Sequence, residues 1–222
     1  MISSFPQIWY RHRVSSLVTT ARTKGEQTRQ TILDAAIERF GHDGFRSTSV
    51  AEVARGAEVG GTVAYTYFEN KEALFLAALD EDVAGVINEA VTSILEPGAD
   101  DAWRGTLIFT LIEALEQHPL ARRVVAGLEP QATGRVIELP ALADLRLAIA
   151  DRLRSDQEAG LVRPDIDPDA VGSGSVTLFI SLLMSTVQFG LDVVDVYGPD
   201  VMALLGAAID PIPPEAQAAE GT

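Results

Sequence analysis

The sequence predicts an all-α protein in which a small N-terminal unit is joined by one long helix to a larger helical bundle. Apolar residues recur at helical spacing in every patterned segment, whereas no segment alternates with the two-residue period of a strand. No internal repeat is visible. Hydrophobic residues make up 47% of the 222 residues, which is ample for a sizeable core in one or two domains.

The first patterned segment, residues 27–42, predicts an amphipathic helix of about four turns. Gly44 follows it as a natural C-cap. A polar and basic stretch at residues 22–26 precedes it. Such a stretch fits either an arm that touches phosphates or the minor groove, or a solvated tail.

Two short helices follow, separated by a tight break. Thr48 or Ser49 can cap the first of them, and Ser49 with Glu52 makes a capping box. The glycine pair at 60–61 relaxes the backbone where the second helix must start at a steep angle. That second helix, residues 62–67, has only about two turns and needs its neighbours for stability. The pattern is typical of a helix-turn-helix that reads the DNA major groove.

A long helix is predicted from Lys71 to about Leu95, with Asn70 as its N-cap and Pro97-Gly98 at its end. Its apolar residues keep the helical period for about six turns. A helix of this length must leave the small N-terminal unit, so we expect it to be the mechanical link to the rest of the chain.

The remaining pattern predicts helices over residues 100–118, from Pro119 through Val125, from Leu139 to Ala159, over 170–191 and from Pro199 to Ile209, with an irregular stretch at 127–138. The segment 170–191 carries no formal charge and is long enough to cross a membrane. Its many hydroxyl side chains and flanking aspartates, with no Lys or Arg at either end, favour a buried helix instead. We expect part of it to pack against a second subunit.

Charge is unevenly divided along the chain. The net charge is −15, but residues 1–71 hold nine Lys and Arg against seven Asp and Glu, whereas residues 72–222 hold eight against twenty-five. We expect only the N-terminal part to meet phosphates. The chain has no cysteine, and its three histidines lie far apart, so we expect no disulfide, no cofactor and no metal site.

The two ends of the chain are expected to be flexible. Residues 1–21 lack the apolar run of a signal peptide and predict a leader in a cytoplasmic protein. Because the helical pattern starts so late, we hypothesise that translation begins further in, for example at Val14 or Val18. Residues 211–222 predict a disordered acidic tail.

Residues 57–75 resemble the signature of the tetracycline-repressor (TetR/AcrR) family. The family pattern reads roughly A-G-V-S-x-G-T-L-Y-x-H/Y-F-x-x-K-E-x-L, and this chain reads AEVGGTVAYTYF followed by ENKEALF. The resemblance extends over about residues 28–75, and its aromatic, glycine, lysine and apolar positions match together. The chain departs from the pattern at Glu58, where glycine is usual, and at Ala64, where leucine is usual. Glycines also replace a serine cap and a polar residue at 60–61.

The resemblance implies a DNA-binding unit at residues 22–70. Tyr65 and Tyr67 match positions that reach the DNA backbone or base edges, and Lys71 matches a lysine that pairs with a phosphate. The methyl groups of Thr62 or Val63 could contact a thymine methyl. Taken singly, each position also fits ordinary packing or capping. The predicted DNA-binding residues are Lys24, Thr48, Ser49, Gly60, Gly61, Thr62, Val63, Tyr65, Thr66, Tyr67 and Lys71.

The resemblance also implies a ligand-sensing and dimerisation domain at residues 71–210. We expect a homodimer formed through about 169–191 and 199–209, which would place two reading units on a palindromic operator. A small apolar or amphipathic effector would release a repressor from that operator. The candidate pocket residues are Trp103, Phe109, Leu111, Leu115, Phe179 and Met184, which also fit plain core, and Glu113 and Gln117, which also fit a solvated face.

Two other functions were weighed against this one. A helical-bundle enzyme would need a nucleophile with its base, a metal cluster or a phosphate loop, and no such motif is present. A helical protein-interaction module that has lost DNA binding stays open, because the N-terminal unit is only weakly basic and Glu58 adds a negative charge. Salt-dependent DNA binding separates these alternatives.

Overall fold

The computed structural model describes residues 23–95 and 103–211, and within these ranges the chain forms helices and no strand. The predicted all-α class is therefore confirmed. In chain order the helices are α2 (Lys24–Ser47), α3 (Val50–Gly56), α4 (Ala64–Tyr67), α5 (Lys71–Leu95), α6 (Trp103–Gln117), α7 (Pro119–Val125), α8 (Pro130–Thr133), η2 (Val136–Glu138), α9 (Pro140–Glu158), α10 (Pro168–Phe189) and α11 (Asp192–Ile209). The expected leader, its translation start, the Pro97-Gly98 break and the tail from residue 212 lie outside the described residues.

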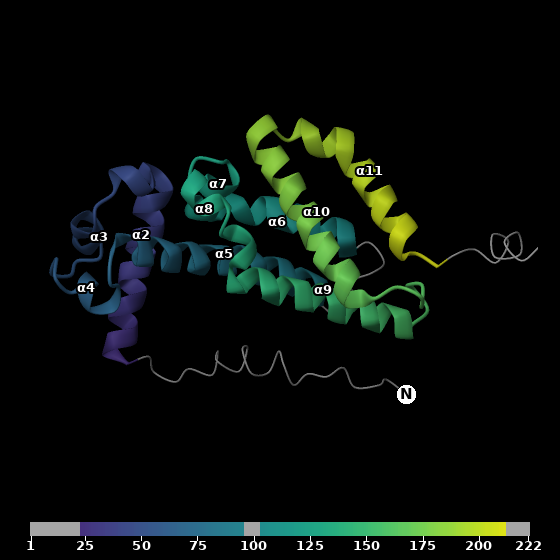
Figure 1. Cartoon of the computed structure of the whole chain (residues 1–222), viewed down its shortest axis with the longest axis horizontal. Coiled ribbons are helices and arrows are strands. Elements are labelled where there is room, and N and C mark those ends of the chain that lie inside the picture. Colours follow the sequence, from purple (N-terminus) through teal and green to yellow (C-terminus); the bar gives the residue numbers. More distant parts are fainter. Residues whose placement is uncertain (1–22, 96–102, 212–222) are drawn as a thin grey trace, which may run out of the picture.

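Helices α2, α3 and α4 form one end of the molecule, which we call the head (Figure 1). Helix α2 begins three residues earlier than predicted because Thr23 and Glu26 form a capping box at its start. It also runs past Gly44, where the chain kinks with φ of 82°. Only glycine adopts this conformation without strain, so Gly44 interrupts the helix where the sequence predicts its end, and one further turn follows to Ser47.

Helix α5 joins the head to the rest of the chain, as the sequence predicts. Its start is fixed by Asn70, whose Oδ1 accepts a hydrogen bond of 2.8 Å from the Ala73 amide. Figure 1 shows α5 running out of the head and along the other helices. Its first turns pack against α2, and its later turns pack against α6 and α9.

Helices α6 to α11 form the rest of the molecule, which we call the body (Figure 1). Two details differ from the sequence prediction. The stretch 127–138 contains the short helices α8 and η2, and α11 begins at Asp192, seven residues before Pro199, which lies inside the helix. Helix α10 is the described helix that is long and apolar enough to span a membrane, and it packs against α9 and α11.

The buried side chains form two hydrophobic cores. One core fills the head and also takes in Leu120 and Val124 of α7. The other fills the body between α5, α6, α9, α10 and α11. Val83 and Val136 pack against both cores. Head and body are therefore continuous through α5, α7 and η2 rather than joined by a loose linker.

Candidate nucleic-acid interface and interior cavity

Helices α3 and α4 are joined by a tight turn that sets their angle. The Ser49 hydroxyl accepts a hydrogen bond from the Glu52 amide at 3.2 Å, and the Ser49 amide donates to Glu52 Oε2 at 2.7 Å. The Ser49 hydroxyl also donates to Glu52 Oε2 at 2.7 Å, and this bond together with the one from the Ser49 amide lowers the pKa of Glu52. The predicted capping box is confirmed. Across the turn, the Val59 amide donates to the Ala54 carbonyl at 2.9 Å.

Helix α4 is shorter than predicted and spans a single turn from Ala64 to Tyr67. Thr62 and Val63 lie in a turn before it, where the Val63 amide donates to the Gly60 carbonyl at 2.8 Å. Ala64 and Phe68 are buried in the head core and hold the helix against α2. A helix this short is stable only through such packing.

One face of the head presents small, polar and aromatic side chains to solvent. Tyr65 is 57% exposed, and Thr66 and Thr62 are exposed beside it along the chain. Val63 and Tyr67 are half-buried. The exposed hydroxyl groups can donate to phosphate oxygens or base edges, and the methyl groups suit thymine. The other predicted residues exposed in the head are Lys24, Ser49, Gly60 and Gly61.

Tyr67 brings the start of α2 next to α4. A Cβ added at Gly25 would lie 3.7 Å from the Tyr67 hydroxyl oxygen, so the aromatic ring reaches the first turn of α2. Lys24, which precedes this glycine and is exposed, therefore lies beside the α4 face. The lysine can add a positive charge to that face without belonging to the helix-turn-helix itself.

Lys71 is held in place by the head. Its Nζ lies 4.5 Å from the centre of the Phe45 ring and donates to the Arg46 carbonyl at 3.4 Å. A cation at the N-terminus of α5 adds to the positive end of the helix dipole and favours an anion there. Arg46 contributes its backbone carbonyl to this contact, and its side chain is exposed. Residues 46 and 71 are 25 positions apart in the sequence, so only the fold brings them together.

Thr48 is buried at the junction of α2 and α3. It is 2% exposed, and its hydroxyl donates to the Gly44 carbonyl at 2.9 Å and to the Arg39 carbonyl at 3.3 Å. These bonds close the end of α2 and leave the hydroxyl facing inward. Of the two candidate caps of α3, Ser49 is the one that caps it, and the DNA contact of Thr48 stays a prediction.

Glu58 sits in the turn with φ of 56°, the left-handed conformation that suits glycine. It is the non-glycine residue with positive φ in the described part of the chain. Its side chain is exposed. The chain thus holds an acidic residue in a strained backbone position next to the candidate nucleic-acid face.

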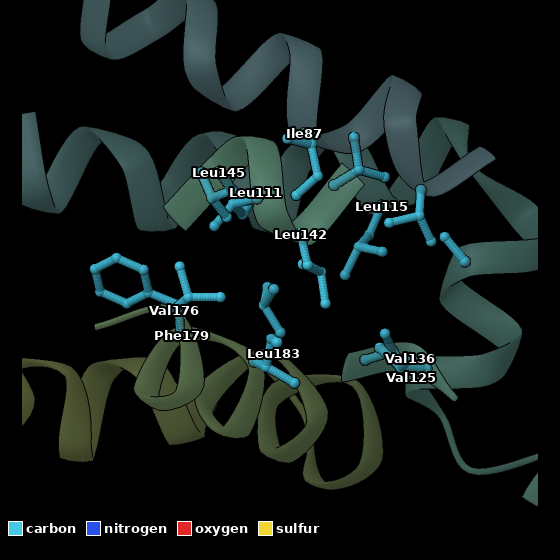
Figure 2. A pocket seen from close by; sticks show the side chains of 14 residues that line it. Ile87, Leu111, Leu115, Val125, Val136, Leu142, Leu145, Val176, Phe179 and Leu183 are labelled. Atoms are coloured by element: carbon cyan, nitrogen blue, oxygen red, sulfur yellow. The ribbon is translucent and has the colours of Figure 1, made fainter. Parts of the chain in front are cut away.

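The body encloses a cavity lined entirely by apolar side chains (Figure 2). The volume of this cavity, counted as the space open to the centre of a water-sized sphere, is about 50 Å³. Figure 2 shows the lining side chains pointing toward one shared space from helices on opposite sides. The lining consists of Val83, Val86 and Ile87 of α5, Leu111 and Leu115 of α6, Ala121 and Val125 of α7, Val136 of η2, Leu142 and Leu145 of α9, and Val176, Phe179, Ile180 and Leu183 of α10.

Three of the eight predicted pocket residues line this cavity: Leu111, Leu115 and Phe179. The other five lie outside the lining. Trp103 is buried, but its indole N–H donates to Asp156 Oδ2 at 3.0 Å in another part of the body core. Met184 is half-buried outside the lining set, and the exposed side chains are those of Phe109, Glu113 and Gln117.

Helix α7 lies between the cavity and the head. Ala121 and Val125 line the cavity, whereas Leu120 and Val124 belong to the head core. The buried Asp82 carboxylate of α5 holds the start of α7, because its Oδ2 accepts from the Leu120 amide at 2.9 Å and from the Ala121 amide at 2.8 Å. Neighbouring residues of α7 therefore contact the cavity and the head core.

Glu129 forms a second connection between body and head. Its Oε1 accepts from the Phe45 amide at 3.0 Å and from Arg123 Nε at 2.7 Å, and its Oε2 accepts from Gln131 at 2.6 Å. Burial by itself raises the pKa of Glu129, but these hydrogen bonds and the Arg123 charge lower it below its ordinary value. The carboxylate is charged at neutral pH and joins the loop after α7 to the kink in α2 at Gly44.

Comparisons with known proteins agree with this arrangement. Residues 32–78 match the sequence model of a family described as bacterial regulatory proteins, tetR family. The chain is 24% identical over 174 residues to the uncharacterized HTH-type transcriptional regulator YdgC of Bacillus subtilis (strain 168), a match that covers 77% of this chain and 86% of that one. It is 30% identical over 148 residues to the A-factor receptor protein of Streptomyces griseus, covering 66% of this chain and 50% of the receptor.

The fold has close counterparts among solved structures. The fatty acid degradation regulator FadR of Bacillus halodurans superposes with a TM-score of 0.64 at 21% sequence identity. The superposition covers 83% of this chain and 97% of FadR. At this level of identity the likeness establishes the shared fold, with its N-terminal helix-turn-helix and helical C-terminal part.

Proposed function

We propose that this chain, a DNA-binding transcriptional regulator of the TetR family, binds a palindromic operator as a homodimer and releases it when a small apolar or amphipathic molecule enters the body cavity. In this proposal residues 22–70 read DNA and residues 71–210 sense the ligand and dimerise. The regulator acts in the cytoplasm as a repressor.

The proposal rests on one observation: α5 and α7 each contribute residues both to the cavity wall and to the head core. The cavity wall and the head core are formed by neighbouring residues of the same helices, so a ligand that moves one moves the other. A ligand changes DNA affinity only through its different affinity for the two arrangements, typically a coupling of about 1–3 kcal/mol.

An exposed apolar surface on α10 and α11 supports the homodimer. Phe189 is 76% exposed and Leu191 is 64% exposed in the single chain, which is unusual for side chains of this size. Val196, Tyr197 and Leu204 of α11 are exposed as well. A symmetric dimer through α10 and α11 would cover exposed apolar side chains with its own copy and set the two heads at a fixed separation. Sedimentation equilibrium should give the mass of two chains.

The DNA-binding part is tested by fluorescence anisotropy with a duplex from upstream of the gene that encodes this chain. Between about 50 and 200 mM salt, affinity should fall steeply, because binding releases counterions from the phosphates. The Lys71→Met variant keeps an unbranched side chain of similar length beside Phe45 but removes the charge, so it should lower the slope by about two, one for each chain of the dimer. Arg154→Ala, on α9 of the body, serves as the matched control and should leave the slope unchanged.

Two results would contradict the proposed DNA contact: a DNA affinity that does not fall with salt concentration, or a salt dependence that Lys71→Met leaves unchanged. A DNA affinity that is independent of salt would instead favour a helical protein-interaction module.

A further inference from the structure

The cavity offers a ligand no polar partner. Its lining side chains are aliphatic apart from Phe179. The helices that carry them use most of their backbone amides and carbonyls within the helix. Two α7 groups are bonded to side chains instead: the Ala121 amide donates to Asp82, and the Val125 carbonyl accepts from Gln188 Nε2 at 3.1 Å. A hydroxyl or amide buried without a hydrogen bond is strongly disfavoured, and an unpaired charge far more so. A ligand therefore gains nothing here by burying a polar group.

The buried carboxylates of the body and the Thr186 hydroxyl are already engaged. Asp82 accepts two amides of α7, as described above, and Asp156 accepts from Trp103 and from Arg152 Nε, the latter at 2.9 Å. The Thr186 hydroxyl donates to the Leu182 carbonyl at 2.8 Å. Among the described residues, the buried side-chain oxygen without a partner is Asp80 Oδ1, which lies one turn before Val83 on α5 and outside the lining.

We propose that the cavity binds an uncharged hydrocarbon group, aliphatic or alicyclic, with no polar atom buried beside it. This inference deepens the proposed function and rests on it, because it specifies the chemical class of the effector. A polar end, where the effector has one, stays outside the lining and contributes no affinity there. Affinity then comes from apolar contact alone and rises with the hydrocarbon surface that the walls cover.

The size of the cavity indicates how such a ligand acts on the helices. Its 50 Å³ exceeds the roughly 10–15 Å³ that one water needs, so a short hydrocarbon fits with little change. A longer or branched one must push the walls apart. Three lining residues lie on helices that also contribute to the head core: Val83 of α5, and Ala121 and Val125 of α7.

The test compares probes that share a six-carbon chain and differ at one end: hexane, hexanol, hexanoate and hexylamine. The full chain is held at one concentration, and its melting temperature is measured at equal free probe concentrations. Hexane should raise the melting temperature most, hexanol less, and the two ions least. Along the series from butane to hexane, affinity should increase by about fourfold per methylene.

Two variants place the binding in the cavity. Val176→Phe fills the space from α10 and should abolish the hexane-induced rise, and Val125→Leu, a milder change on the opposite wall, should reduce it if the larger substitution prevents folding. Leu147→Phe enlarges a side chain of α9 that is 53% exposed, so it serves as the matched control. The control should respond to hexane as the parent does.

The outcomes separate this inference from the proposed function. If hexanoate or hexylamine raises the melting temperature as much as hexane, and Val176→Phe removes that rise, the hydrocarbon class is wrong while a ligand cavity stands. Loss of the amine effect in Asp80→Asn would identify Asp80 as the anchor. If no probe changes the melting temperature, the inference is overturned. If hexane binds as expected but leaves operator affinity unchanged, the ligand class stands and the release mechanism fails.

Discussion

The head and the body of this molecule are stabilised in different ways. In the head, capping boxes fix the starts of α2 and α3, and Phe40, Phe45 and Phe75 pack with ring centres 5.0–6.2 Å apart. In the body, α9 and α11 start without a side-chain cap, Asp167 caps α10, and the core contains a cavity. Hydrogen bonds at a cap favour one geometry, whereas side chains beside empty space have room to shift. We infer that the head is the more rigid of the two regions and the body the more deformable.

The largest effect is expected from the same substitution made in each region. Leu74 in the head and Leu111 in the body are both buried, but Leu111 already borders empty space. Leu74→Ala should cost about 4–5 kcal/mol of unfolding free energy, and Leu111→Ala about 2–3 kcal/mol, because Leu111 has fewer contacts to lose. Urea unfolding of both variants at one protein concentration measures the difference. Equal losses of unfolding free energy in the two variants would contradict the proposed difference between head and body.

The next effect concerns the connection between the regions. Glu129→Ala leaves the Phe45 amide and Arg123 without their acceptor and should cost about 2–3 kcal/mol of unfolding free energy. It should also reduce the change in operator affinity that an effector causes. Glu138→Ala, at an exposed carboxylate in η2, is the control and should stay within about 0.5 kcal/mol of the parent. A full effector response in Glu129→Ala would show that the change reaches the head without this connection.

The same residue predicts a dependence on pH. Because the folded state lowers the pKa of Glu129, its contribution to stability is complete above the unfolded-state pKa of about 4.3 and is lost as pH falls through the lower, folded-state pKa. Glu129→Gln should therefore lose less stability than the parent in this acid range. Urea unfolding at pH values above and below this range provides the measurement. An identical acid profile for both proteins would argue against the ionised connection.

The smallest effect is expected at Glu58, where the rigid head carries strain. Glu58→Gly should stabilise the protein by about 1 kcal/mol or slightly less, because glycine adopts the left-handed conformation without strain but has more freedom when unfolded. Glu58→Gln removes the charge and keeps the strain, so it separates the two contributions. Both variants should bind the operator more tightly in anisotropy titrations, but only the glycine should raise the melting temperature. A gain in stability from Glu58→Gln would contradict this assignment.

The local features of the fold could be predicted from the sequence, and the contacts between distant segments could not. Helix α5 was placed from Lys71 to Leu95 because its cap and its apolar period lie within the segment itself. The start of α11 was missed because Pro199 favours the first turn of a helix, yet apolar residues before it extend the helix back to Asp192. Glu129 was missed because its partner Phe45 is 84 residues away.

The same reasoning explains the outcome for the two sites. The face of the head was identified from its motif, and only the inward turn of Thr48 escaped the prediction. The pocket prediction favoured large aromatic and sulfur-containing residues, but these fill space rather than leave it. The cavity is bounded mainly by valine and leucine, whose positions around an opening depend on how five or more segments pack together. No local pattern encodes that.

Gly41 of α2 touches Pro119 of α7 so closely that a Cβ added to the glycine would lie 2.7 Å from the proline Cβ and 3.1 Å from the Leu120 nitrogen. The backbone of Gly41 lies directly against the Pro119 ring, and no flexible side chain separates them. We therefore expect a displacement of α7 to press directly on α2, so that a change in the cavity wall would be felt in the head.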